Sequence, residues 1–383
     1  MRYLTAGESH GKAVVTIVEG LPSQLPLAVN RLEQELARRR LGYGRGGRMS
    51  IEADRVEILS GVRQGRTLGS PLCMAVENLD RHNWLEVMPV EDTGTLVAPL
   101  TVPRPGHADL AGSVKYGTKD IRDILERASA RETLGRVLAG AAARVLLEEM
   151  GIEILSHVTG IGELDVSGES VPAPGSGPGI DESPLRCLNS SMERETMALI
   201  DAAKEAGDSL GGRFQVVAFG VPPGLGSHVH WDRRADGLLA QAVMSIPAIK
   251  SVSLGKAEEV SRERGSQAQD PIAYGSQGWM RPTNNAGGVE GGITNGQPLV
   301  MNGAMKPIPT IPAGLPSVDL VTKEEKRPAA ERADTCAVPA AAVVAESAVA
   351  WVLAVLLMEK LGGDTLPEMK SRYQDYLAYW KDF

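Results

Sequence analysis

The chain has 383 residues, a formal net charge of −8 at pH 7 and only 4% aromatic residues. This acidic balance argues against bulk binding to nucleic acid or to an anionic membrane surface. The three cysteines (Cys73, Cys187 and Cys336) are widely spaced without a C-x-x-C pair, which argues against a disulfide framework or a zinc site and indicates a reducing, cytosolic protein.

The first motif, Gly-Glu-Ser-His-Gly at 7–11, fits the G-x-S-x-G pattern of a hydrolase nucleophile elbow. Such an elbow needs a buried strand before the serine and a helix after it. Only a short run at 2–4 precedes the motif, and the β-branched run AVVTIV at 13–18 predicts a strand after it. We therefore interpret the glycines as allowing close approach of backbone to a ligand, with His10 rather than Ser9 as the reactive group.

Two helices are predicted next. The segment 29–40 has apolar residues at helical spacing, with Asn30 as a candidate cap, and it ends in the glycine-rich run LGYGRGGR. The segment from about 120 to 150 carries one apolar stripe without an internal proline, so we expect a single central helix. The Gly-, Ser- and Pro-rich stretch at about 166–188 predicts a flexible excursion.

The second half predicts helices near 192–204 and 233–246, and a strand in GGRFQVVAFGVP at 211–222. His228 and His230 are expected on one face of a further strand. The apolar run 338–358 is about as long as a membrane span, but it contains Glu346 and is rich in alanine, so a core or subunit-interface helix is the better interpretation. Period-two runs bounded by glycine, without strict βαβ alternation, favour an antiparallel α+β fold. At the N-terminus no basic region precedes an apolar run, so we expect no signal peptide.

Arginines recur beside glycine or alanine in the motifs 38–48, 102–112, 126–133 and 331–347. Any single one of them is better explained as a solvated surface arginine. Together, small neighbours that let a ligand approach guanidinium groups indicate an anionic substrate. The segment GRGGR also fits an RGG-type RNA-binding run, but the acidic balance and the scarcity of aromatic side chains argue against that.

Two of the six histidines, His10 and His107, each lie beside a glycine in a glycine-rich turn, as an exposed general acid would. No spacing of histidine, cysteine and carboxylate makes a convincing metal site.

Taken together, these motifs closely resemble the chorismate synthase family. GESHGKAVVTIVEGLP is similar to the family's N-terminal signature, ERASARETLGRVLAGA to its central one and RADTCAVPAAAVVAESA to its C-terminal one. RRRLGYGRGGRM, RPGHADLAG, NNAGGVEGGITNG and MKPIPT also occur in the family's order, so the resemblance covers the chain from Ala6 to Glu346.

The resemblance implies a carbon–oxygen lyase of the shikimate pathway. It would convert 5-enolpyruvylshikimate 3-phosphate to chorismate by a trans 1,4-elimination of phosphate and a ring proton. Reduced FMN is implied without net redox change, and NADP is associated with the activity. The implied fold is a single α+β domain over 1–383, with helices sandwiched between antiparallel sheets, in a cytoplasmic homotetramer whose flavin sites lie near subunit contacts. Reduced flavin would come from an external source, since no reductase domain is evident.

Residue by residue, His10 matches the histidine that protonates the departing phosphate, His107 the one that protonates the reduced flavin, and Asp334 the aspartate implicated in removing the ring proton. Substrate-side arginines are matched by Arg39, Arg45, Arg48, Arg104, Arg131 and Arg332. Flavin contacts are matched by Arg127, Ala128, Ser129, Pro247, Ala248, Gly291, Lys306, Pro307, Ile308, Pro309, Thr310 and Arg332.

Three positions depart from the family. Ala333 occupies a place where serine or histidine is common, Pro309 one where serine is common, and Pro247 one where glutamine is common. Each change removes a side-chain hydrogen-bonding group, and the prolines also lack an N–H. We therefore expect altered flavin contacts at these three positions.

Overall fold

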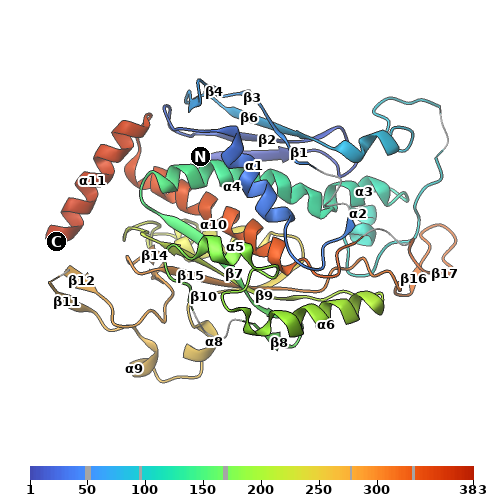
Figure 1. The fold of residues 1–383 in the computed structure, drawn as a ribbon. Coiled ribbons are helices and arrows are strands. Elements are labelled where there is room, and N and C mark those ends of the chain that lie inside the picture. Colours follow the sequence, from blue (N-terminus) through green and yellow to red (C-terminus); the bar gives the residue numbers. More distant parts are fainter. Residues whose placement is uncertain (48–52, 95–96, 167–170, 277, 330–332) are drawn as a thin grey trace.

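Two antiparallel sheets lie on opposite sides of a layer of helices (Figure 1). The computed structural model describes residues 1–47, 53–94, 97–166, 171–276, 278–329 and 333–383. Helices α4 and α10 pack together in the middle layer; α4 contacts β1 and β2 of one sheet, and α10 contacts β7 and β9 of the other. The expected α+β sandwich of helices between antiparallel sheets is confirmed.

The first sheet has the strand order β1-β2-β6-β3. Its strands are β1 (Arg2–Ala6), β2 (Ala13–Glu19), β6 (Leu72–Glu77) and β3 (Val56–Ser60). Along β2, Val14, Thr16 and Val18 face the helices and are buried, whereas Ile17 is exposed on the other face. This alternation is the period-two pattern of a sheet that buries one face.

The second sheet has the order β10-β15-β9-β7-β8. Its strands are β10 (Ile249–Leu254), β15 (Leu299–Met305), β9 (Gly212–Phe219), β7 (Glu153–Ile161) and β8 (Leu164–Asp165). The predicted strand at 211–222 is β9, in the centre of this sheet. Two-stranded ribbons complete the described strands: β4 (Val62–Arg63) with β5 (Arg66–Thr67), β11 (Ala273–Gly275) with β12 (Gly278–Met280), β13 (Val289–Glu290) with β14 (Ile293–Thr294), and β16 (Ser317–Val318) with β17 (Glu325–Lys326).

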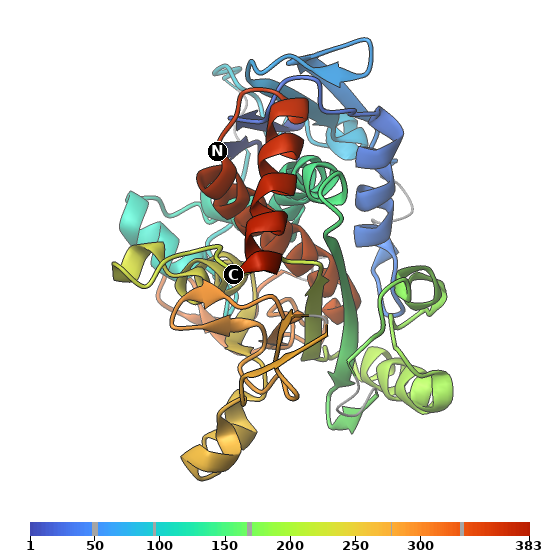
Figure 2. The same ribbon diagram turned by 90° about the vertical axis from the view of Figure 1, so that its left-hand side faces the viewer.

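The helices largely follow the predicted segments. They are α1 (Val29–Arg40), α2 (Asp109–Tyr116), α3 (Arg122–Ala128), α4 (Thr133–Glu148), α5 (Gly177–Glu182), α6 (Glu193–Glu205), α7 (Ala235–Met244), α8 (Ala257–Val260), α9 (Gly265–Ala268), α10 (Val338–Leu361) and α11 (Leu366–Asp382). Asn30 lies inside α1, whose N-cap is Ala28, so the expected cap is wrong. Figure 2 shows α11 in red on the face turned toward the viewer, with the α8–α9 segment projecting below.

The expected single helix over 120–150 is wrong, because the chain breaks it at Ser129. This residue has an extended backbone, and its hydroxyl accepts a hydrogen bond from the N–H of Arg131. A serine that satisfies a backbone donor in this way caps a new helical start. Helices α3 and α4 are therefore separate elements joined by the short 3-10 turn Ala130–Glu132.

The apolar helix α10 is long and apolar enough to cross a membrane, but 83% of its most apolar window is buried inside the molecule. It runs between α4 and the second sheet (Figure 1). The core interpretation of this segment is therefore the one that fits the structure.

Two loop predictions differ from the structure. In the expected excursion at 166–188, the part that follows 167–170 forms α5 and places Leu185 and Arg186 in the interior. His228 and His230 lie in an exposed bend rather than a strand, and His230 pairs with Asp232. Composition reports the small residues of such a segment, but not the packing partners that the fold supplies.

Candidate functional site

The Gly-Glu-Ser-His-Gly motif forms the loop between β1 and β2, which pair as an antiparallel hairpin. Gly7 has φ +116°, and a Cβ there would lie 2.2 Å from the carbonyl oxygen of Ala13, so only glycine fits. A nucleophile elbow needs a helix after the serine, and here a strand follows it. The hydrolase interpretation of Ser9 therefore does not fit the fold.

His10 is held by Glu126 of α3. The backbone N–H of His10 donates to Glu126 Oε2 at 2.8 Å, and its ring Nδ1 lies 2.8 Å from Glu126 Oε1. The loop is also tied at both ends, because the side-chain amide of Asn78 donates to the carbonyl oxygens of Glu8 and Gly11. The loop that carries His10 is thus held by Glu126 on one side and by Asn78 on the other.

Three arginines surround one buried carboxylate, that of Asp54. Arg131 Nη1 lies 2.6 Å from Asp54 Oδ1, while Arg39 Nη2 and Arg40 Nε lie 3.2 and 3.7 Å from Oδ2. Arg131 also donates to Asn78 Oδ1, which joins this group to the His10 loop. Burial lowers the pKa of Arg39 to about 10, to which the charges of Arg131 and Arg45 contribute. Three guanidinium groups therefore converge on the carboxylate of Asp54.

Asp334 holds the arginine–glycine loop that follows α1. Its Oδ1 accepts from the N–H of Gly46 at 2.6 Å, and its Oδ2 lies 2.7 Å from Arg45 Nη1. A Cβ on Gly46 would lie 2.8 Å from the carbonyl oxygen of Ala333, so the glycine allows this close contact. The N-cap of α10 is Ala337, so Asp334 does not cap that helix.

His107 lies in the loop before α2 and shares the carboxylate of Asp109 with Arg104. His107 Nδ1 is 2.5 Å from Asp109 Oδ1, and Arg104 Nε is 2.9 Å from Asp109 Oδ2. Burial by itself would raise the pKa of Asp109, but hydrogen bonds from His107 and Arg104 lower it well below its ordinary value. Asp109 is therefore charged at neutral pH, and the His107 ring donates to it.

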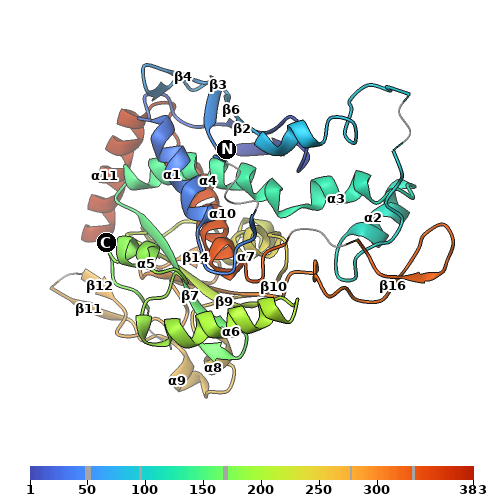
Figure 3. The same cartoon turned by 45° about the vertical axis from the view of Figure 1, so that its right-hand side comes forward.

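The His107 loop lies against the segment 306–310. Arg104 Nη1 donates to Thr310 Oγ1 at 3.1 Å, and Lys306 Nζ donates to the carbonyl oxygen of Gly106 at 2.6 Å. The N–H of Lys306 in turn donates to the carbonyl oxygen of Ala248, beside Pro247. Figure 3 shows the neighbouring α2, α3 and β16 regions gathered on one side of the molecule.

Residues 209–210 connect the segment 306–310 to the Asp334 region. Ser209 Oγ donates to the carbonyl oxygen of Ile308, and the N–H of Leu210 donates to the carbonyl oxygen of Thr335, next to Asp334. The contacts therefore link His10 to Arg131 and Arg39 in one group, and His107 to segment 306–310 and the Asp334 region in another.

Four of the residues matched to substrate or flavin contacts lie outside these two groups or outside the described part of the chain. The guanidinium of Arg127 donates to the carbonyl oxygens of Gly7 and Thr5 and to the Thr5 hydroxyl, so it braces the His10 loop. Gly291 lies in the β13–β14 turn, which adjoins the Leu299 end of β15, whereas Lys306 follows the Met305 end. A strand of this length separates them by roughly 20 Å. Arg48 and Arg332 lie outside the described residues.

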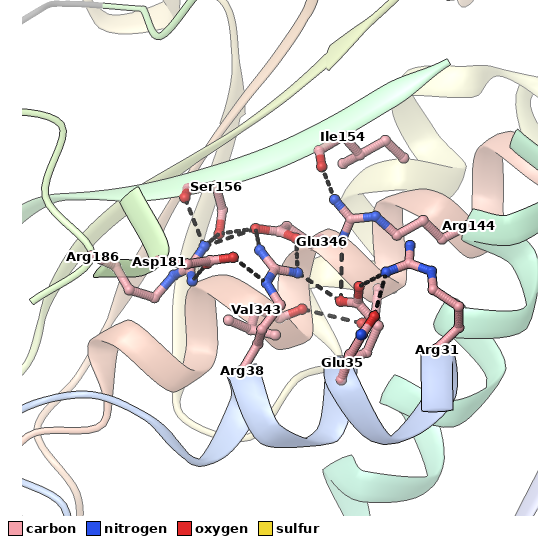
Figure 4. A network of polar contacts seen from close by, with 12 residues as sticks. Arg31, Glu35, Arg38, Arg144, Ile154, Ser156, Asp181, Arg186, Val343 and Glu346 are labelled. Atoms are coloured by element: carbon pink, nitrogen blue, oxygen red, sulfur yellow. Dashed lines mark hydrogen bonds and ion pairs between the residues drawn. The ribbon is translucent and has the colours of Figure 1, made fainter. Parts of the chain in front are cut away.

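A second polar cluster connects α1 to α4 and α10 (Figure 4). Glu346 of α10 is buried and pairs with Arg38 of α1, Arg144 of α4 and Arg186. Arg38 immediately precedes Arg39, so the two side chains point from one helix end into different polar groups. The cluster thus fixes the helix end from which Arg39 approaches Asp54.

Sequence reasoning missed the carboxylates Asp54, Asp109 and Glu126. Glu126 lies inside the motif ERASARET and Asp109 lies two residues after His107, so a search for acids near the two histidines would have found them. Asp54 has no local signal, since its importance comes from the arginines that two separate segments, α1 and the turn before α4, bring to it.

The comparisons with known proteins agree along the whole chain. The family model described as chorismate synthase matches residues 1–358. A protein of Moorella thermoacetica named chorismate synthase is 54% identical over 383 residues, covering 100% of both chains. Another of that name, from Aquifex aeolicus, is 51% identical over 393 residues, covering 100% of this chain and 99% of its own.

A solved crystal structure of chorismate synthase superposes with a TM-score of 0.79 at 42% identity, covering 100% of this chain and 98% of the other. Fold, motifs and comparisons lead to the same conclusion: the chain belongs to the chorismate synthase family.

Proposed function

We propose that the site described above carries out the family's reaction by holding an anionic substrate beside His10 and His107. The reaction is the trans 1,4-elimination of phosphate and a ring proton from 5-enolpyruvylshikimate 3-phosphate, which gives chorismate. The observation that carries this assignment is the set of three guanidinium groups around the carboxylate of Asp54. Guanidinium groups bind phosphate and carboxylate groups bidentately, which suits a substrate with one phosphate and two carboxylates.

In this proposal each side chain has a separate role in the elimination. The bond from ring carbon to phosphate oxygen breaks with its electron pair on oxygen, and His10 donates a proton to the departing phosphate. A ring C–H bond breaks, its electron pair enters the new double bond, and Asp334 takes part in removing the proton. Arg39, Arg45, Arg104 and Arg131, together with Arg48 and Arg332, bind the anionic groups.

When bound, reduced FMN would supply electron density to the substrate without net redox change, and His107 would hold the proton exchanged with the flavin. Lys306 and Lys250 would hold a flavin phosphate, because they follow the paired residues Met305 of β15 and Ile249 of β10. Burial and then the charge of Lys250 also lower the pKa of Lys306. A phosphate group would neutralise both. The flavin site would be lined by Lys306 to Thr310, Pro247, Ala248, Ala128 and Ser129. Arg127 would act indirectly, through the His10 loop to which it donates hydrogen bonds.

The proposed enzyme is a cytoplasmic homotetramer that receives reduced FMN from an external reductase, with NADP associated with that supply. Its cysteines are free, as in a reducing compartment. Leu4, Ile17 and Leu59 leave apolar side chains exposed on the first sheet, which suits a subunit contact. Gly291, about the length of β15 away from Lys306, would then serve a flavin bound near such a contact.

The deciding experiment is an anaerobic assay of phosphate release from 5-enolpyruvylshikimate 3-phosphate with chemically reduced FMN. We expect many turnovers per flavin, and no sustained turnover with oxidised FMN under air. His107→Ala should lower the rate by about 100-fold or more, whereas the exposed His228→Ala should not change it. Sustained turnover without reductant would contradict the proposed role of reduced flavin.

A further inference from the structure

His10 and three neighbouring side chains form a contacting group. They are His10 from the β1–β2 loop, Trp84 after the 3-10 helix Leu79–Asn83, and Arg122 and Glu126 from α3. The imidazole stacks on the indole with ring centroids 3.8 Å apart and planes inclined by 21°. The guanidinium of Arg122 lies over the same indole, 5.5 Å from its centroid.

One face of α3 supplies both ends of this group. Arg122 and Glu126 are four residues apart, so their side chains project from the same side of the helix. Arg122 meets Trp84 and Glu126 meets His10. Each of the two stacked rings thus contacts a charged side chain of α3. The four residues come from three segments that are distant in the sequence.

Glu126 determines which ring nitrogen of His10 can transfer a proton. Its side chain is only 1% exposed, and its two oxygens contact the backbone N–H and Nδ1 of the same residue. An ionised carboxylate only accepts hydrogen bonds, so Nδ1 must donate its proton to Glu126. Proton exchange with a substrate therefore falls to Nε2.

Trp84 restricts the plane of the ring. A face-to-face stack at this distance prevents rotation of the imidazole about its second side-chain torsion, and the face of an indole also favours a positively charged ring. The indole N–H donates to Asp80 Oδ2, which keeps Trp84 itself in place. The hydrogen bond to Glu126 and the stacking contact with Trp84 therefore both restrict the orientation of the His10 ring.

We propose that Glu126 and Trp84 are positioning residues for His10, the carboxylate selecting Nε2 as the proton donor and the indole aiming it at the departing phosphate. This inference rests on the proposed function of His10. In the step concerned, the N–H bond at Nε2 breaks, its electron pair stays on nitrogen, and the proton joins a phosphate oxygen. The neutral ring that remains still carries its proton on Nδ1, where Glu126 stabilises it.

Steady-state and single-turnover kinetics with reduced FMN test the inference through Glu126→Gln and Trp84→Phe. Glu126→Gln should lower kcat about 100-fold, the effect expected of a general acid that is held in the wrong tautomer or orientation, with KM changed less than threefold. Trp84→Phe keeps an aromatic face and should retain most activity, whereas Trp84→Ala should lose about tenfold. Matched controls are Asp123→Asn, an exposed carboxylate on the same helix, and His82→Ala in the segment before Trp84.

A double-mutant cycle separates positioning from mere structural support. In a His10→Ala background, Glu126→Gln should cost no further rate, because the residue acts through His10. Unchanged kcat in Glu126→Gln, or costs that multiply in the double variant, would overturn the inference. A wild-type enzyme that is inactive with reduced FMN would instead overturn the proposed function, so the two failures are distinguishable.

A readout without catalysis is the ¹⁵N NMR spectrum of histidine-labelled protein, with the His10 signal assigned by its loss in His10→Ala. The wild-type ring should carry its proton on Nδ1 when neutral, and Glu126→Gln should populate the other tautomer. The same mixture of tautomers in both proteins would contradict the role of Glu126.

Discussion

In each histidine proposed for the chemistry, a buried carboxylate determines which ring nitrogen carries the proton. His10 has Glu126 and His107 has Asp109, and in both pairs the carboxylate contacts Nδ1. Because an ionised carboxylate accepts the Nδ1 proton, Nε2 is the nitrogen assigned to chemistry in each ring. Two loops of unrelated structure therefore use one physical device.

Asp334→Asn tests the proposed role of this residue in proton removal. Asparagine can still accept the N–H of Gly46, but it cannot act as a base, so kcat should fall about 100-fold or more while KM changes little. Single-turnover kinetics with reduced FMN and saturating substrate measure the effect. A raised KM with unchanged kcat would instead show that Asp334 acts only by holding Arg45 for substrate binding.

Asp54→Asn tests the shared carboxylate. The substitution removes the charge that pairs with the buried guanidinium groups of Arg39 and Arg131, so we expect a loss of unfolding free energy of about 3 kcal/mol or more. KM for the substrate should rise, because Arg39 and Arg131 lose the group that orients them. Urea denaturation and steady-state kinetics check both effects, with the exposed Asp92→Asn as control. Wild-type stability and KM would show that the arginines do not depend on Asp54.

At the scale of elements, the break at Ser129 makes the site possible. It separates α3, which presents Glu126 to His10, from the turn that presents Arg131 to Asp54. An uninterrupted helix would continue at 100° per residue, and it would lose the extended residue that redirects the chain. The local capping chemistry of one serine thus places two functional side chains.

Gly140→Ala tests the close crossing of α4 and α10. A Cβ at Gly140 would lie 2.4 to 2.5 Å from the Cβ and backbone of Ser347, which cannot move without shifting α10. Overpacking of this kind costs about 1–3 kcal/mol, so the melting temperature should fall. Gly179→Ala in α5, where nothing lies within 4 Å, should be neutral or slightly stabilising. Equal melting temperatures for the two variants would refute tight packing at the crossing.

Glu346→Gln tests the buried cluster between α1, α4 and α10. Burial would raise the pKa of Glu346, but Arg38, Arg144 and Arg186 lower it below 4.5. Its stabilising effect is therefore present above about pH 4.5 and is lost on acidification. The variant should lose about 3–5 kcal/mol of unfolding free energy at neutral pH, and its stability should fall less steeply below pH 4.5.

Glu359→Gln on the same helix is the matched control. Its partner Arg233 is exposed, so the change should stay within about 1 kcal/mol. Urea denaturation between pH 3 and 7 measures both variants. Similar losses in the two would mean that the buried pairs contribute no more than exposed ones.

At the scale of the whole molecule, the site joins loops of both sheets to the helical layer. Substrate should therefore stabilise the fold as a unit, by about 2.7 kcal/mol at a concentration of 100 Kd. Thermal denaturation with and without 5-enolpyruvylshikimate 3-phosphate measures the shift, and Arg39→Ala should reduce it strongly. An equal shift in that variant would place the substrate away from the Asp54 group.

The sequence by itself determined the local elements with strong periodicity and the identity of the family. Helix α1 has the bounds predicted from its apolar spacing, and the alanine-rich segment at 338–358 lies within the buried helix α10. The glycine-rich motifs carried the resemblance because glycine is required where backbone approaches backbone, as at Gly7 and Gly46. Such constraints act over a few residues and can therefore be recognised in the sequence alone.

Only the tertiary structure decided which charges meet. Asp54 contacts side chains from α1 and from the turn before α4, Glu126 lies 116 residues from His10, and Glu346 lies 308 residues from Arg38. A carboxylate selects its partners by distance in space and by burial, and neither has a period or a spacing along the chain. The sequence therefore indicated the histidines and arginines of the site, and the fold supplied the carboxylates that orient them.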